Sequence, residues 1–171
     1  LKKKYPIKII DQKNQGKYMA LNNALKTTDT EYFACLDADS FVTKDSLKHL
    51  LAEFTSEKVV ASMPIMKVLN PRNYIEKIQH LEYMTSIFLK MMMEARDCIH
   101  VAPGPFTVYR TSILKKIDGF RKAHMTEDME IALRLQSKHY KLKQSRKAII
   151  YTKAPDTFGK YYRQRIRWYR G

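Results

Sequence analysis

Two aspartates, Asp37 and Asp39, directly follow the apolar run EYFACL and are separated by a single residue. Alternate side chains of an extended chain point the same way, so both carboxylates are expected to face one cleft where the strand ends. Mg²⁺ and Mn²⁺ are held by one or two carboxylates together with substrate phosphates, and the ion then acts as a Lewis acid on a diphosphate leaving group. The pair is equally typical of a solvated turn in which aspartate caps the backbone.

A second acidic group lies in the segment TEDME, where Glu127, Asp128 and Glu130 follow Thr126. Carboxylates in the first turn of a helix are stabilised by the helix dipole, by a few tenths to about 1 kcal/mol each, so a structural role alone explains them. A functional role requires one of them to act as a general base that takes a proton from an attacking hydroxyl.

Basic and aromatic residues supply groups that complement a diphosphate. Lys17 follows a glycine at the start of a predicted helix, where a lysine and free backbone N–H groups can reach a phosphate. In the ending YYRQRIRWYRG, Arg165 and Arg167 can bind a diphosphate bidentately, and Trp168 offers a flat face to a sugar, a base or a lipid headgroup. Taken alone, this ending is equally typical of a basic amphipathic helix at a membrane surface.

The composition bounds the class of protein. The chain has 171 residues, 44% of them hydrophobic, and a formal net charge of +15, which indicates one folded domain whose partners are phosphates, acidic lipid headgroups or nucleic acid. Cys35 and Cys98 lie in apolar surroundings without zinc-ligand spacing, so both are expected to be buried, reduced thiols in a cytosolic compartment. No apolar run approaches the ~20 residues of a membrane span, and Glu82 and Lys90 interrupt the longest apolar segment.

The apolar periodicity predicts alternating strands and helices in one compact unit. Strands are predicted at 6–10, 31–36, 59–65 and 148–155, and helices at 18–25, 43–54, 70–97, 111–117, 126–141 and from 157 onward. This alternation favours an α/β sandwich with a largely parallel sheet flanked by helices, in which ligands gather at the carboxyl ends of the strands.

The order of the motifs resembles that of the processive family 2 glycosyltransferases, which include the synthases of cellulose, chitin, hyaluronan and poly-N-acetylglucosamine. GKxxALN comes first, then DAD after an apolar strand, TED before a helix, and QRIRW near the end. The match runs from about Asn14 to Gly171, nearly the whole chain. QxxRW is its most specific part, because single-transfer relatives generally lack it.

The resemblance implies a GT-A-like fold and a role for each donor-binding residue. Lys17 would lie at the nucleotide end of the donor and Asp37 would contact the donor nucleotide or sugar. Asp39 would ligate the Mg²⁺ or Mn²⁺ ion that bridges the diphosphate. Gln164 and Arg167 would close over that diphosphate.

The resemblance also implies the residues that act on the acceptor. Asp128 would be the general base for the acceptor hydroxyl, with Thr126 and Glu127 shaping its surroundings, and Trp168 would be the platform for the growing glycan. The implied activity is inverting, processive transfer of a hexose or N-acetylhexosamine from a UDP-sugar to the end of a polysaccharide.

Two features that flank the motifs in family members are missing from residues 1–171. Family members begin with a strand and Asp-rich turns that form much of the uridine pocket, and these should precede 6–10. They also carry transmembrane helices beside the catalytic domain. We therefore expect residues 1–171 to be a single catalytic domain that lacks the first part of the nucleotide-binding half. It would work at the cytoplasmic face of the cell membrane and bind its donor poorly alone.

Three other functions fit parts of the sequence. A single-transfer enzyme acting on a lipid carrier would yield a one-sugar lipid in place of long glycan. The basic charge with interleaved tyrosines is compatible with a nucleic-acid-binding module, which filter binding would reveal, although DAD and TED would repel nucleic acid. A non-catalytic scaffold is the third.

Overall fold

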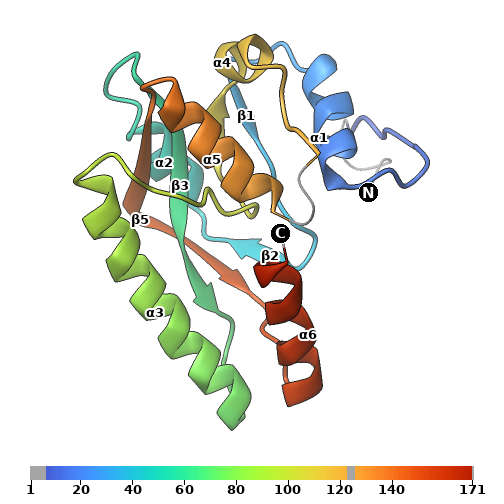
Figure 1. Cartoon of the computed structure of the whole chain (residues 1–171), viewed down its shortest axis with the longest axis vertical. Coiled ribbons are helices and arrows are strands. Elements are labelled where there is room, and N and C mark those ends of the chain that lie inside the picture. The colour runs from blue at the N-terminus through green and yellow to red at the C-terminus, as the bar shows by residue number, and fades with distance from the viewer. Residues whose placement is uncertain (1–6, 123–125, 171) are drawn as a thin grey trace.

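The computed structural model describes residues 7–122 and 126–170, which form a sheet with helices against it (Figure 1). In chain order the elements are α1 (Lys17–Lys26), β1 (Tyr32–Ala34), β2 (Ser40–Val42), α2 (Ser46–Leu51), β3 (Val59–Val68), α3 (Tyr74–Glu94), β4 (Val108–Arg110), α4 (Thr111–Lys116), α5 (Glu127–Ser137), β5 (Lys141–Thr152) and α6 (Phe158–Tyr169). None of these helices is long and apolar enough to cross a membrane.

The five described strands form one mixed sheet in the order β1-β4-β3-β5-β2. Strands β3 and β5 pair in parallel, whereas β1–β4, β3–β4 and β2–β5 are antiparallel. The predicted α/β class is confirmed, but the predicted largely parallel sheet is wrong. A helix between two strands does not fix whether the second strand runs parallel or antiparallel to the first. Here the loop 95–107 after α3 allows β4 to pair antiparallel to β3.

The core lies on both faces of this sheet. Neighbouring residues of a strand point to opposite faces, and accordingly Tyr109 belongs to one buried cluster and Val108 to the other. The larger cluster joins β3 and β4 to α1, α4 and α5, and the smaller one contains Leu50 of α2. Figure 1 shows α3 and α5 on the near face of the sheet and α2 behind it.

Helix α3 confirms the predicted long helix with shorter bounds. It begins with a capping box in which Asn73 accepts from the backbone N–H of Glu76 and the Glu76 side chain accepts from the backbone N–H of Asn73. Much of its apolar face stays exposed, with Leu81 67% and Phe88 61% accessible. This helix therefore borders open space instead of sealing the core.

Two predictions of secondary structure are wrong, one for a strand and one for the end of a helix. Residues 7–10 of the predicted strand 6–10 form no strand and are exposed, since no described strand lies beside them to pair with; residue 6 lies outside the described residues. The predicted helix 126–141 ends at Ser137, because His139 adopts a left-handed conformation with φ 61° that turns the chain into β5.

The cysteines also differ from expectation. Cys35 is half-buried, whereas Cys98 is exposed beyond the end of α3. The apolar neighbours of Cys98 in the sequence point elsewhere, since Ile99 is buried while the thiol donates a hydrogen bond to the carbonyl of Met93. The expectation that both thiols are buried is therefore wrong.

Candidate active site

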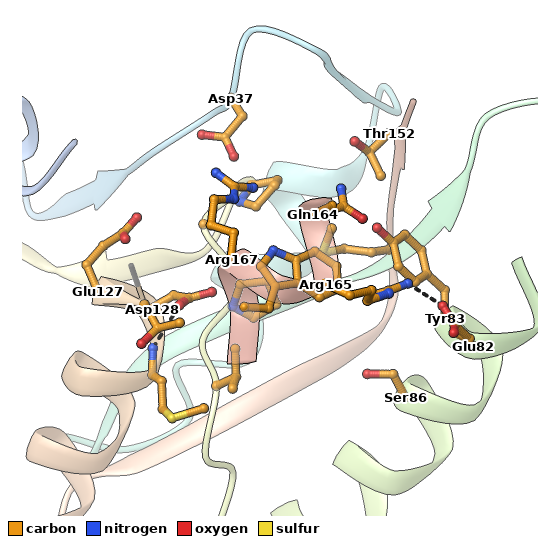
Figure 2. Close-up of a pocket in the computed structure, with 18 of the residues that line it drawn as sticks. Asp37, Glu82, Tyr83, Ser86, Glu127, Asp128, Thr152, Gln164, Arg165 and Arg167 are labelled. Carbon is orange, nitrogen blue, oxygen red and sulfur yellow. Dashed lines mark hydrogen bonds and ion pairs between the residues drawn. The ribbon is translucent and has the colours of Figure 1, made fainter. Parts of the chain in front are cut away.

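One open cavity of about 1410 Å³ collects the residues predicted to do chemistry. Helices α3, α5 and α6 line it (Figure 2). The start of α1, the loop after β1 and the turn at 103–105 complete the lining. The predicted site residues that line it are Lys17, Asp37, Asp39, Thr126, Glu127, Asp128, Gln164, Arg167 and Trp168. Segments far apart in the sequence thus meet around one space.

The cation of Lys17 lies between two carboxylates. Its Nζ is 2.8 Å from Oδ1 of Asp37 and 3.5 Å from Oε1 of Glu127. Burial opposes the charge, but the hydrogen bond to Asp37 and the nearby carboxylates leave the pKa of Lys17 above its ordinary value. Gly104 leaves room for this contact, because a Cβ there would lie 2.6 Å from the Lys17 Nζ.

Helix α1 presents its N-terminus to the same cavity. Gly16, at the N-cap, has φ 96°, a conformation that side chains rarely adopt, and no side chain caps the first turn. Gln15, Gly16, Lys17 and Tyr18 all line the cavity. Uncapped N–H groups beside a protonated lysine form a suitable site for a phosphate.

Asp39 is exposed on the turn after β1, where its Oδ1 accepts a hydrogen bond of 3.3 Å from the Ser40 hydroxyl. Asp37 is already paired with Lys17. Among the described residues, no group of three or more His, Cys, Asp or Glu side chains is placed to hold a metal ion. The donor set therefore fits a Mg²⁺ or Mn²⁺ ion bound by one carboxylate and by substrate phosphates, as is common for these ions, and does not fit an all-protein metal site.

Asp128 lies in the first turn of α5 next to Glu127. Its Oδ1 accepts a hydrogen bond of 3.0 Å from the backbone N–H of Met129, and its carbonyl accepts one of 3.1 Å from the N–H of Ala102. Burial, and then the charge of Glu127, raises the pKa of Asp128 above its ordinary value. A raised pKa brings a carboxylate closer to the range in which a general base is effective. Thr126 is the N-cap of α5, without a side-chain cap bond.

Helix α6 presents Gln164, Arg167 and Trp168 to the cavity. Figure 2 shows the first two of these. Gln164 has a buried Oε1 without a hydrogen-bond partner among the described residues, and Arg167 is exposed. The interpretation of Arg165 as a diphosphate ligand is not supported. Its guanidinium pairs with Glu82 and lies 4.2 Å from the centre of the Trp168 ring.

Helix α3 contributes cavity residues that sequence reasoning missed. Glu82, Ser86 and Lys90 all line the cavity and recur every fourth residue, so they share one face of the helix. Burial lowers the pKa of Lys90 to about 8, and the Asp128 carboxylate opposes that shift. The four-residue spacing of these polar side chains was the available signal.

Lys90 is predicted to destabilise the fold at neutral pH. Its pKa is about 8 in the folded chain, against roughly 10.4 in an unfolded one. The unfolded chain therefore binds more protons between these values, and the free energy of unfolding rises with pH across that window. Lys90→Met should increase this free energy at pH 7 by on the order of 2 kcal/mol and remove the rise.

The measurement for Lys90 is urea unfolding at pH 7 and pH 9.5. Lys77→Met, which changes an exposed lysine of the same helix, is the matched control and should alter neither value. A Lys90→Met variant that is less stable than the wild type at pH 7 would contradict the prediction.

A comparison with known families decides the class of the protein. Residues 32–171 match the family described as Glycosyl transferase family group 2. The chain belongs to this family. The glycosyltransferase is 30% identical over 173 aligned residues to the poly-β-1,6-N-acetyl-D-glucosamine synthase of Staphylococcus epidermidis. That alignment covers 99% of this chain but 42% of the relative, so the glycosyltransferase chain spans less than half the length of that curated protein.

Solved structures support the fold of the glycosyltransferase. The mannosyltransferase PcManGT from Pyrobaculum calidifontis, solved with GDP-Man and Mn²⁺, superposes with a TM-score of 0.70 at 20% identity, covering 92% of this chain and 41% of the other. Staphylococcus aureus TarS 1-349 in complex with UDP superposes with a TM-score of 0.52 at 20% identity, covering 81% and 40%. At these identities the likeness concerns the fold, a mixed α/β fold that is similar to that of GT-A glycosyltransferases.

Proposed function

We propose that this chain is the catalytic portion of a processive polysaccharide synthase. It would transfer a hexose or N-acetylhexosamine from a UDP-sugar to the end of a growing glycan at the cytoplasmic face of the membrane. The main support is the convergence of an uncapped helix start beside a lysine, an exposed aspartate, a half-buried carboxylate and an aromatic ring in one cavity. The curated relative makes a poly-N-acetylglucosamine, which makes UDP-N-acetylglucosamine the first donor to test.

The donor diphosphate is assigned to the space between α1 and α6. Lys17 and the uncapped start of α1 would bind it from one side, while the Arg167 guanidinium and the side-chain NH2 of Gln164 would donate to it from the other. Asp39 would hold the divalent ion, which neutralises the charge that develops on the leaving diphosphate.

Asp128 is assigned the role of general base. Its carboxylate takes the proton of the acceptor hydroxyl as the oxygen forms a bond to the anomeric carbon of the donor sugar. The bond from that carbon to the diphosphate breaks in the same step, and UDP leaves with the bonding electrons. A single displacement inverts the configuration at the anomeric carbon and requires no covalent intermediate on the protein.

The acceptor is assigned to the apolar side of the cavity, next to Trp168. This ring is 38% exposed and borders the cavity, so it can stack on a sugar. The cavity exceeds the ~300–1,000 Å³ typical of a site for one small ligand, which leaves room for a glycan end beside the donor. Further uridine contacts are proposed to come from segments outside residues 1–171, so this chain alone would bind UDP weakly.

The test incubates membranes that contain the full-length protein with a panel of radiolabelled UDP-sugars. Incorporation of N-acetylglucosamine into long polymer is the expected result. A lipid that carries one sugar would support the single-transfer alternative, and no incorporation from any donor would refute the proposed activity.

A further inference from the structure

The carboxylate of Glu82 on α3 forms the centre of a cluster that holds α6. One of its oxygens pairs with the Arg165 guanidinium, and the other accepts a 2.7 Å hydrogen bond from the Tyr161 hydroxyl. The guanidinium lies 4.8 Å from the centre of the Tyr161 ring and 4.2 Å from that of Trp168. Arg165 thus lies over two aromatic rings. Its charge is balanced by Glu82, a pairing that Figure 2 draws.

Little else fixes the body of α6. None of the residues of this fully described helix, Phe158–Tyr169, is buried, so hydrophobic packing contributes little to its position. The segment before it is tethered to α3 by two amides, since Asn73 donates to the carbonyl of Asp156 and Gln79 donates to that of Pro155, both at 2.8 Å. Those contacts fix where α6 begins, but not its rotation about its own axis.

The rotation of α6 decides which side chains face the cavity. Gln164 and Arg167 flank Arg165 in the sequence, and Trp168 lies one turn after Gln164. Since residues of one helix turn together, anchoring Arg165 to α3 also sets the directions of the other three. A shift of about 1 Å in groups that orient a substrate can cost on the order of 100-fold in rate.

We propose that Glu82 is a positioning residue, which fixes α6 through Arg165 and Tyr161 so that Gln164, Arg167 and Trp168 face the donor and acceptor. Glu82 does not itself contact the reacting atoms in this arrangement. The inference rests on the function proposed above, and it assigns Arg165 to the support of the site and not to the diphosphate.

Trp168 gives a readout that does not depend on activity, because it is the one tryptophan among the 171 residues. Glu82→Gln removes the charge that holds Arg165 but keeps an oxygen for Tyr161. In the 171-residue chain, we expect the Trp168 emission to shift and its quenching by acrylamide to increase. Glu94→Gln is the matched control, because Glu94 is a half-buried carboxylate of the same helix that pairs with Lys143 at 3.0 Å, and it should leave the emission unchanged.

Activity is measured in parallel in the full-length protein. Glu82→Gln should lower the rate of sugar transfer about 10- to 100-fold, Glu82→Asp should restore part of that rate, and Glu94→Gln should stay near the wild type. Tyr161→Phe, which removes one hydrogen bond, keeps the test valid if Glu82→Gln fails to fold, and it should shift the emission in the same direction. Unchanged emission in both variants, or changed emission with an undiminished rate, would overturn the proposal. A wild type without transferase activity whose emission still responds to Glu82→Gln would refute the proposed function and leave the contact between Glu82 and α6 standing.

Discussion

Asp128→Asn is expected to abolish sugar transfer in the full-length enzyme while donor binding is retained. The amide is nearly the same size as the carboxylate and can still accept the hydrogen bond from the Met129 N–H, so the local fold should persist. It cannot take the proton of the acceptor hydroxyl, and loss of a general base typically costs about 10²–10⁴-fold in rate. The measurement is incorporation of labelled sugar, with UDP affinity determined in the same preparation.

The control for this substitution is Asp97→Asn, which removes a carboxylate paired at 2.7 Å with Lys141 on the surface and should leave the rate unchanged. The pH profile gives an independent check. The base acts only when deprotonated, and burial and Glu127 raise the pKa of Asp128, so the rate should fall with decreasing pH at values above the ordinary range for aspartate, near 4. Near-normal activity of Asp128→Asn would exclude Asp128 as the base.

Asp39→Ala is expected to remove the dependence of donor binding on Mg²⁺ or Mn²⁺ and, with it, activity. Asp39 is the acidic side chain of the DAD motif that is not paired with Lys17, and no described cluster of three acidic or imidazole ligands could replace it. The remaining phosphate contacts from Lys17 and Arg167 should still give weak, metal-independent binding of UDP.

The experiment for Asp39 is calorimetric titration of UDP into the full-length protein with and without Mn²⁺. Asp29→Ala is a suitable control, because the Asp29 side chain is 98% exposed and lies outside the cavity. If Asp39→Ala bound UDP with the wild-type dependence on Mn²⁺, the metal would have to be held elsewhere.

The sequence predicted the segments that form the site more accurately than it predicted the sheet that brings these segments together. DAD, TED and QxxRW each lie at the start or end of a predicted element, and each of those elements exists, although α5 ends at Ser137 and not at 141. The direction of the strands could not be predicted, because the same pattern of strand and helix fits parallel and antiparallel returns. The basic segment 141–147 hid the first half of β5, since its charges mask the buried alternation of Leu142 and Gln144.

Within the site, residues of the same type looked alike in the sequence, and only the fold shows that their contacts differ. Two arginines close together looked equally suited to a diphosphate, yet the fold engages Arg165 with Glu82 on α3 and leaves Arg167 exposed. Glu82 and Lys90 served in the sequence only as evidence against a membrane span. Their contribution to the cavity depends on α3 facing α5 and α6, an arrangement that no local pattern encodes.

The central claim is that segments around Lys17, Asp39, Asp128 and Arg167 form one site for a metal-bound diphosphate and a sugar acceptor. A structure of the full-length protein with UDP and Mn²⁺ tests it most directly. We expect the diphosphate to lie between Lys17 and Arg167, the metal ion on Asp39, and the Asp128 carboxylate facing the space beyond the terminal phosphate. A nucleotide bound outside this cavity, or a metal ion that does not contact Asp39, would contradict the account.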